Sequence, residues 1–340
     1  MLILDDTGFL KQGKASVGVA RQYYGTLGKV GNCQVAVTCV YSDPQASWPV
    51  EVRLYLPESW TEDPERRRRA GVPPELVFQT KPQLALSLVE QARELAVPFR
   101  CVVADADYGD NPNFLAGLEE RQLSYVVAMR CDFRVQLTEG TTDEYQRVDQ
   151  CLATAPKGWW RTVRWRQGSK GWLRKKFLAL ACRWRAGDGS VRAGWLLGER
   201  PGRGQSGEHK YYLSNLPPTT PLPKLAEYAH RRHAIEQFHE EGKGEMGWDQ
   251  YQGRLWRGFH RHAVTVLLAY SFLVWLELRQ RKARTGPGRP RSPLPPAGPQ
   301  KEGAALGAPG GGWVAPPSGS TMVDHHRSVP SDMRTEELTK

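Results

Sequence analysis

Short apolar segments with alternating polar positions recur through the first 130 residues, and β-branched residues are frequent in them. This pattern is typical of β-strands. The predicted strands cover residues 1–4, 33–40, 50–56, 100–105 and 124–130.

Helical patterns separate the later strands. Residues 82–96 carry apolar side chains at helical spacing, and Asn111 followed by Pro112 is typical of an N-cap and a first helical position, with the helix continuing through Leu123. Three strands, a helix, a strand, a helix and a strand predict an α/β fold. Its first strands should be antiparallel neighbours, and its later strands should be joined by crossovers.

The pattern changes after residue 132. Residues 133–216 predict a run of β-strands separated by Gly-rich turns, and helical periodicity returns over residues 223–241 and from residue 255 to about residue 282. Residues 285–320 contain 9 Gly and 9 Pro, half of the segment. Such a stretch cannot bury enough apolar surface to offset its ordering entropy, so a disordered Pro/Gly-rich tail is predicted over residues 284–340.

One segment is apolar enough to be considered as a membrane span. Residues 263–276 are almost continuously apolar, but this is shorter than the ~20 residues that a spanning helix needs. Charged residues flank it on both sides, and a buried helix of a soluble domain is the prediction. The amino terminus, MLILDD, has neither the basic region nor the cleavage site of a signal peptide, and a cytoplasmic location is expected.

Composition narrows the class of partner. The chain has 340 residues, 40% of them hydrophobic, and 47 Lys and Arg against 36 Asp and Glu give a formal charge of +11. A basic surplus favours a polyanionic partner, because Lys and Arg displace counterions from phosphates. The run of four arginines at residues 66–69 is predicted to be a solvated loop that can also contact phosphate. The six cysteines form no CxxC pair and are predicted to be small buried hydrophobic residues in a reducing compartment.

Three carboxylates stand where active sites form. Asp5 and Asp105 each follow a hydrophobic strand, and ligands of open α/β sheets collect at the carboxyl ends of strands. On the third predicted helix Arg232 and Glu236 are four residues apart, and Lys243 lies two turns beyond Glu236. A single Asp at a strand end is most often a loop cap, and Arg232 with Glu236 can equally be a surface ion pair. Three acids in this order favour an oxygen-rich site for Mg²⁺.

With these residues in view, the chain resembles the DDE transposases of bacterial insertion sequences. Three patterns over about residues 1–280 carry the resemblance: a strand followed by Asp5-Asp6-Thr7, a strand followed by Asp105 with Tyr108 and Gly109, and the spacing of Arg232, Glu236 and Lys243. The resemblance implies an RNase H-like core made of residues 1–132 and 217–283. The segment 133–216 would be a β-rich insertion before the catalytic Glu.

The resemblance also implies an activity and its ligands. Asp5, Asp105 and Glu236 would hold two Mg²⁺ ions, with Mn²⁺ as a substitute, and would cleave DNA at transposon ends and transfer the strand into target DNA. The implied partners are double-stranded DNA, namely terminal inverted repeats and target, and a second copy of the chain in a synaptic complex. Expected DNA contacts come from Arg232, Lys243, Lys11, Lys14 and Tyr228.

A tryptophan of the insertion is implied to stack against a displaced base. The candidates are Trp159, Trp160, Trp165, Trp172, Trp184 and Trp195, and core packing is the ordinary role of most of them.

The chain departs from the family pattern at two places. The Tyr expected three residues before Arg232 is Ala229, with Tyr228 one position away. The family also carries a DNA-binding and dimerising region before the first Asp, so an amino-terminally truncated transposase is expected.

Several alternatives stay open at this stage. Asp6 competes with Asp5 and Asp107 competes with Asp105, since neighbours along a strand point to opposite faces. The histidines near Glu236 lack the spacing of zinc ligands, and phosphate or structural hydrogen bonds are their expected role. A catalytically inactive DNA-binding remnant and another RNase H-fold nuclease, such as a resolvase, are the alternative functions.

Overall fold

The computed structural model describes residues 1–25, 28–138, 144–168, 171–202, 204 and 206–284. The predicted tail over residues 284–340 lies almost wholly outside the described residues. The strands are β1 (Leu2–Leu10), β2 (Ala20–Tyr24), β3 (Lys29–Ser42), β4 (Ser47–Leu54), β5 (Cys101–Ala104), β6 (Ser124–Met129), β7 (Arg134–Leu137), β8 (Gln146–Arg147), β9 (Arg161–Gly168), β10 (Gly171–Arg185), β11 (Val191–Arg200) and β12 (Lys210–Ser214). The helices are α1 (Glu58–Thr61), α2 (Pro64–Ala70), α3 (Lys81–Glu94), α4 (Ala106–Gly109), α5 (Pro112–Glu120), α6 (Val148–Thr154), η2 (Lys157–Trp159), α7 (Leu222–His230), α8 (His233–Gly244), η3 (Trp248–Gln250) and α9 (Trp256–Arg284).

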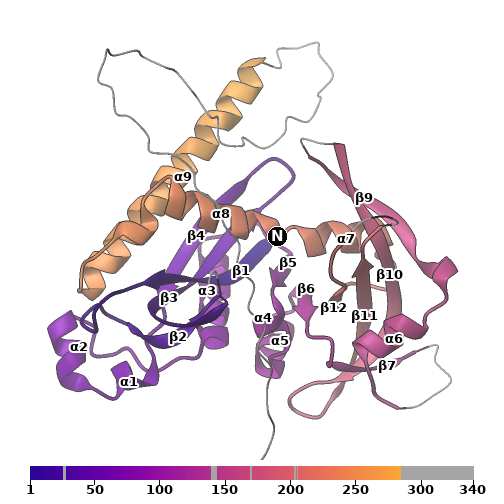
Figure 1. Cartoon of the computed structure of the whole chain (residues 1–340), viewed down its shortest axis with the longest axis horizontal. Coiled ribbons are helices and arrows are strands. Elements are labelled where there is room, and N and C mark those ends of the chain that lie inside the picture. The colour runs from indigo at the N-terminus through magenta and orange to yellow at the C-terminus, as the bar shows by residue number, and fades with distance from the viewer. Residues whose placement is uncertain (26–27, 139–143, 169–170, 203, 205, 285–340) are drawn as a thin grey trace, which may run out of the picture. The chain divides into compact units, whose positions relative to one another are not determined.

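A mixed sheet organises the described residues. Its strand order is β2-β3-β1-β5-β6-β12-β11-β10-β7-β8, with β4 paired to β3 and β9 paired to β10 (Figure 1). β1 pairs antiparallel with β3 and parallel with β5, and β5 pairs parallel with β6. The α/β fold class with flanking helices is therefore confirmed, including antiparallel neighbours first and crossovers later.

The first strands differ from their predicted bounds. β1 continues through the two acids to Leu10, because it stays paired with β3 along its whole length. Asp5 therefore lies inside a strand, and the prediction of a strand that ends before it is wrong. The sequence pattern also missed β2, a short strand whose polar positions alternate in burial.

Helix boundaries in the core follow capping chemistry. Thr80 caps α3 in a capping box with Gln83, and the Asn111 side chain accepts a hydrogen bond from the Phe114 amide at the start of α5. Pro112 occupies the first position of α5, so both features predicted there are confirmed. The apolar sides of α3 and α5 pack in one core cluster with Leu4 and Val102 of the central strands.

The run of four arginines was predicted to be a loop, but in the structure it forms most of α2. Asp63 accepts a hydrogen bond from the Arg66 amide as the N-cap, and Gly71 ends the helix in the left-handed region at φ 66°. The Arg67 guanidinium donates to the carbonyls of Pro73 and Leu76. Part of the run therefore fixes the local fold.

The strands after residue 132 continue the same sheet. β12 pairs antiparallel with β6 of the core, and β11 and β10 follow it outward. α6 and η2 cover one face of these strands, where Leu152 and Trp160 pack with Leu178 and Leu196. α7 covers the opposite face, where Leu225 joins a cluster with Phe177 and Leu197.

The helix predicted over residues 223–241 is in fact two helices. The chain turns at Arg231 and Arg232, where the hydrogen bonds run to the third preceding residue, as from the Ala234 amide to the Arg231 carbonyl. The Arg231 guanidinium donates to the carbonyl of Asp43 and to Glu227. This turn places Arg232 at the start of α8.

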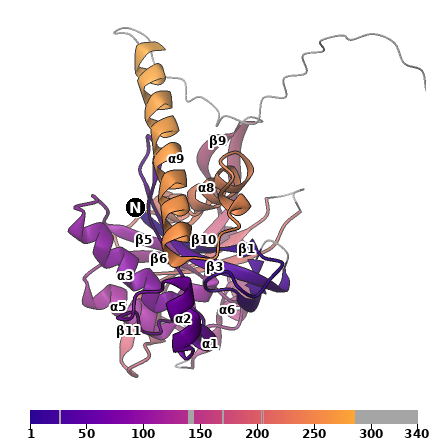
Figure 2. The same cartoon turned by 90° about the vertical axis from the view of Figure 1, so that its left-hand side faces the viewer.

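α9 is only half buried, which corrects the prediction of a buried helix. Phe259, Ala263 and Val266 face the core, whereas Leu268, Phe272 and Trp275 are exposed. Its carboxyl-terminal half extends beyond the other elements (Figure 2). Among the described residues this helix is long and apolar enough to cross a membrane by length and composition, which is weak evidence, and 22% of the apolar window is buried.

Candidate active site

Asp5 and Asp105 lie side by side on adjacent parallel strands. The pairing of β1 with β5 matches Leu2 with Val102 and Ile3 with Val103. Asp5 lies two residues after Ile3 in β1, and Asp105 lies two residues after Val103, directly after the end of β5. The same register therefore brings the two carboxylates to one level of the sheet. Asp105 also caps α4, accepting a hydrogen bond from the Asp107 amide at 3.1 Å.

Glu236 reaches this position from α8, which packs across β1 and β3. Arg232 joins it to the first carboxylate. One guanidinium nitrogen lies 2.7 Å from Asp5 Oδ2, and the other donates to Glu236 Oε1. The three predicted catalytic carboxylates, together with Arg232 and Lys243, line one pocket of about 620 Å³.

The electrostatics of the pocket are those of crowded acids. Burial raises the pKa of Asp5 well above its usual value, and the nearby Asp105 carboxylate raises it further. Burial likewise raises the pKa of Asp105 to about 6, although the positive charge of Arg232 opposes the shift. A hydrogen bond from His233 and the charge of Arg232 lower the pKa of Glu236 to about 2. Asp5 and Asp105 therefore form a buried pair that a cation would stabilise in its charged form.

A neutral histidine, His239, is linked to the Asp5 backbone through Thr38. Burial, with the charges of Lys243 and Arg232, lowers the pKa of His239 to about 3. Its Nε2 lies 2.8 Å from Thr38 Oγ1, and the Thr38 hydroxyl donates to the Asp5 carbonyl at 3.1 Å. Because the hydroxyl proton is used there, His239 Nε2 must be the donor, which fixes its tautomer.

Lys243 closes the same side of the pocket. Its ammonium donates to the Gly8 carbonyl at 2.9 Å and lies over the rings of Phe9 and Tyr24 at 5.2 and 5.7 Å. Burial lowers the pKa of Lys243. A side chain added at Gly8 would meet the Tyr24 ring at 2.2 Å, so this close approach requires glycine.

The competing acids are held by other cations. Asp6 lines the pocket, but its carboxylate pairs with Lys81 at 2.6 Å. Asp107 also lines the pocket, and its exposed side chain pairs with Arg130 at 3.0 Å. Neither carboxylate contacts Arg232, whereas Asp5 does at 2.7 Å.

The packing around α4 shows why Tyr108 and Gly109 follow Asp105. A Cβ at Gly109 would lie 2.0 Å from the Ala128 carbonyl oxygen, so α4 can approach β6 only with glycine at this position. Tyr108 is fully buried against Phe114, with ring centroids 5.5 Å apart. Its hydroxyl has no hydrogen-bond partner among the described residues. These two residues seat the short helix that Asp105 caps.

Three predicted DNA contacts lie outside the pocket. Lys11 is buried, and its ammonium donates to the Tyr251 carbonyl, which does not fit a surface contact with DNA. Lys14 is exposed. Tyr228 packs with the cluster around Leu225 and accepts a cation–π contact from Lys224 at 4.8 Å.

A second pocket, of about 550 Å³, adjoins the first through Glu236. It is lined by His233 and Arg231 on the helical side and by Trp165 and Trp172 on the side of β9 and β10. Among the six candidate tryptophans, Trp160 and Trp184 are buried in the core, and Trp165 is stacked on His230 at 3.9 Å. Trp159 and Trp172 are the most exposed, at 51% and 53%.

A buried cluster that the sequence did not reveal ties β9–β12 to α7. The Glu199 side chain is fully buried, and it bonds the Lys175 ammonium and, at 3.0 Å, the Tyr212 hydroxyl. His230 Nε2 lies 3.0 Å from Glu199 Oε2, the same oxygen that accepts from Tyr212. Lys81 was missed as well, whereas His239 makes a structural hydrogen bond of the kind expected for the histidines near Glu236. Only a pattern of long-range contacts, absent from a single sequence, could have identified these residues.

The donor set fits a hard divalent cation. Carboxylate oxygens are the ligands that Mg²⁺ and Mn²⁺ take in proteins, and Asp5 and Asp105 form a buried pair whose mutual repulsion a cation would relieve. In the described part of the chain, no three His, Cys, Asp or Glu side chains are grouped as a ready cage. Arg232, which contacts both Asp5 and Glu236, is the group whose movement would free Glu236 as a third ligand.

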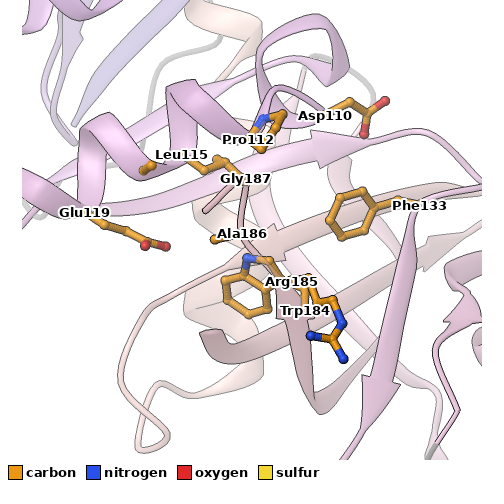
Figure 3. A pocket seen from close by; sticks show the side chains of 11 residues that line it. Asp110, Pro112, Leu115, Glu119, Phe133, Trp184, Arg185, Ala186 and Gly187 are labelled. Atoms are coloured by element: carbon orange, nitrogen blue, oxygen red, sulfur yellow. The ribbon is translucent and has the colours of Figure 1, made fainter. Parts of the chain in front are cut away.

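Figure 3 shows a smaller pocket of about 210 Å³ that contains none of these acids. α5 contributes Pro112 and Leu115 to its lining, and the turn after β10 contributes Ala186 and Gly187. The Trp184 and Phe133 rings border it. Its lining is mainly apolar and offers no cluster of catalytic groups.

The sequence is similar to a described protein family and to a known protein. A family described as DDE superfamily endonuclease matches residues 1–172. The chain is also similar to a protein named probable transposase for insertion sequence element IS701, from Microchaete diplosiphon, at 27% identity over 259 residues. The alignment covers 74% of this chain and 59% of that relative, so the chain spans less than two thirds of the relative's length.

Proposed function

The chain belongs to the DDE superfamily of endonucleases, and on that premise we propose that it is a transposase of an insertion sequence. Its reaction would be cleavage of DNA at the transposon ends followed by strand transfer into target DNA. The partners would be double-stranded DNA, as terminal inverted repeats and target, and a second copy of the chain. The similarity to the IS701 transposase supports the DNA substrate, and a DNA-acting enzyme of this kind works in the cytoplasm.

One observation carries the proposal. The parallel register of β1 and β5 sets Asp5 beside Asp105, and Glu236 faces them across a pocket through Arg232. We assign these three as the metal-binding carboxylates, with Asp5 and Asp105 as the buried pair. Two Mg²⁺ ions, or Mn²⁺ in their place, would supply activation of the attacking oxygen and stabilisation of the leaving oxygen when bound.

The remaining residues of the pocket position the substrate. Arg232 and Lys243 are cations at the rim and floor of the pocket, and they would hold phosphates that flank the scissile bond. His239, neutral and locked through Thr38, would keep the backbone at Asp5 in register. In the first step water attacks phosphorus and releases a 3′-hydroxyl. In the second step that hydroxyl attacks a target phosphate and displaces the 3′ oxygen of the target strand, with no covalent enzyme–DNA intermediate.

Trp172 is the tryptophan that we assign to stacking on a displaced base. It is half exposed and lines the pocket that Glu236 shares. Trp159 is as exposed but lines neither of the two pockets around Glu236. Base–aromatic stacking contributes about 1–3 kcal/mol per base, so Trp172→Ala should weaken end binding more than Trp159→Ala.

A strand-transfer assay with purified protein tests the proposal. DNA carrying the element's ends is incubated with Mg²⁺ or Mn²⁺, and Asp105→Asn is the control. Strand-transfer products that disappear in the Asp105→Asn variant support a transposase. Tight DNA binding without any cleavage would favour an inactive DNA-binding remnant, and cleavage of branched DNA without strand transfer would favour another RNase H-fold nuclease.

A further inference from the structure

The β9–β10 hairpin has two faces with different surroundings. On one face Val163 and Phe177 pack against α7. On the other face Leu178 and Cys182 pack with α6, on the side away from α7. Because side chains alternate along a strand, Lys176 and Arg174 lie on the same face as Leu178, beyond the part that α6 covers. The sheet thus separates α7 from the hairpin's outer surface.

Four cations occupy that outer surface, which we call the outer basic strip: Arg164, Arg174, Lys176 and Arg200. The strand register places Arg164 opposite Arg174 on β9 and β10. It places Lys176 opposite Arg200 on β10 and β11. Opposed residues on antiparallel strands have Cβ atoms about 5 Å apart, so the strip consists of two close pairs of positive charges that run in a zigzag across β9, β10 and β11.

Nothing within the described residues neutralises the strip. None of its four side chains pairs with a carboxylate in the described part of the chain, whereas Lys175, on the opposite face, pairs with Glu199. Like charges directly opposite on a sheet are destabilising. The Arg200 guanidinium is stacked on the Trp160 ring at 4.1 Å, which holds it in an extended position. A bound polyanion would relieve the repulsion among these positive charges.

We propose that the outer basic strip binds the phosphate backbone of a DNA duplex other than the one whose scissile bond lies at Asp5 and Asp105. This inference rests on the proposed function, because it takes DNA as the substrate. Its site is on the face of the sheet opposite to α7, and none of its four residues lines either pocket around Glu236. The pocket that Glu236 shares meets this face at Trp172, near the end of the hairpin, so a duplex seated in that pocket would have to pass the hairpin end to reach the strip.

The chemistry of the strip favours phosphate over an acidic protein. Arg164 and Arg174 are exposed, and all four residues of the strip carry positive charge, which pairs with phosphate oxygens. Phosphate contacts from Arg and Lys need no base recognition, and they supply the non-specific part of DNA binding through counterion release. The strip is therefore suited to a duplex of any sequence, such as a target.

A two-duplex capture experiment tests this inference on the full chain. The protein carries Asp105→Asn, so that DNA is bound and not cut, and is loaded on an immobilised duplex. Capture of a second, fluorescent duplex is then measured over a series of salt concentrations. The test variant is R164Q/R174Q/K176Q/R200Q, and R93Q/R100Q/R257Q/R261Q is the matched control, which removes the same charge from other exposed positions.

The test variant should hold the first duplex and lose second-duplex capture by about 10-fold or more. Its capture should also depend less on salt, with a slope reduced by up to about 3.6, since each of four lost phosphate contacts removes roughly 0.9. The control should capture normally. R164Q/R174Q alone, confined to two exposed side chains, keeps the test valid if the larger variant unfolds, and it should lose about half of the slope change.

Unchanged capture by the test variant would overturn the proposal. Equal loss of both duplexes would overturn it too, since the strip would then belong to a single DNA path. Selective binding of an acidic polypeptide in place of the second duplex would assign the strip to a protein partner. Failure of the proposed function would appear elsewhere, as absence of metal-dependent cleavage by the protein with an intact Asp105 and an intact strip.

Discussion

At the scale of single residues, the site depends on which carboxylates are paired with which cations. Asp5 shares Arg232 with Glu236 and lies beside Asp105, while Asp6, the next residue, is neutralised by Lys81. Both Asp5 and Asp105 have pKa values raised by burial, as expected for acids poised to bind a cation. The distinction between two adjacent aspartates therefore becomes a testable difference in activity.

Asp5→Asn and Asp6→Asn should differ strongly. We expect Asp5→Asn to lower DNA cleavage by more than about 100-fold, because a direct ligand matters at least as much as the outer partners of a metal site. Asp6→Asn removes an ion pair with Lys81 at the pocket edge and should lower cleavage by less than about 10-fold. Initial rates of nicking on an end-containing duplex measure both. Equal losses in the two variants would transfer the assignment to Asp6 or to neither residue.

At the scale of elements, two close contacts support the segments that carry Asp105 and Arg232. α4 is pressed against β6 through Gly109, which lets Asp105 cap the helix. The Glu199 cluster joins β10, β11 and β12 to the end of α7, two residues before Arg232. Each contact can be changed at one residue that lies outside the pocket of the three carboxylates.

Gly109→Ala should destabilise the protein and impair cleavage together. The added Cβ would lie 2.0 Å from the Ala128 carbonyl, so α4 has to shift, and overpacking of this kind costs about 1–3 kcal/mol. Urea unfolding measures the stability change, and Gly158→Ala, where no atom lies within 4 Å of the new Cβ, is the matched control. Wild-type stability in Gly109→Ala would contradict the proposed packing of α4.

Glu199→Gln should destabilise the protein in a pH-dependent way. Burial alone would raise the pKa of Glu199, but hydrogen bonds and charges from His230 and Lys175 outweigh it and lower the pKa to about 2. Because the folded pKa lies below the unfolded value of 4.5, the stabilisation is present above about pH 4.5 and is lost as pH falls toward 2.

The difference corresponds to about 3 kcal/mol at neutral pH. The difference in unfolding free energy between Glu199→Gln and wild type should therefore shrink as pH falls from about 4.5 toward 2. Glu94→Gln, at an exposed helix end, is the control and should show little pH dependence. A constant difference across the acid range would show that the cluster does not hold Glu199 in its charged form.

Local signals predicted much of the fold. Asn111 and Pro112 gave the start of α5, and apolar runs gave the central strands. The arginine run was misassigned although Asp63, Pro64 and Gly71 mark the two ends of a short helix. The turn at Arg231 could not be predicted, because no Gly or Pro marks it and its bonds reach Asp43, which is remote in sequence.

The residues of the candidate site also divide into those that the sequence predicted and those that it did not. Asp5 and Asp105 were predicted from their places after apolar strands, and Glu236 from its spacing to Arg232 and Lys243. Lys81 and Glu199 were not predicted, because their roles depend on contacts across 75 and 24 residues of sequence. A structural hydrogen bond was expected of His239, but not its partner Thr38, which lies 201 residues away. Long-range pairing of this kind leaves no periodic pattern in the chain.

At the scale of the whole molecule, one sheet connects the catalytic strands with the strands after residue 132. β6 carries the connection, paired with β5 on one side and with β12 on the other. A movement of the outer strands would therefore reach α7 and Arg232 through the Glu199 cluster. The formal charge of +11, with a basic strip on the outer face, suits an enzyme that holds more than one stretch of DNA.

Iron-directed cleavage of the polypeptide tests the central claim most directly. Fe²⁺ bound in place of Mg²⁺ generates oxidants that cut the chain only near the metal, so fragments report which segments surround it. We predict cuts near Asp5, Asp105 and Glu236, suppressed by excess Mg²⁺ and reduced in Asp105→Asn. Cuts confined to other segments, or cuts unchanged by Asp105→Asn, would contradict the assignment of these three carboxylates to one metal site.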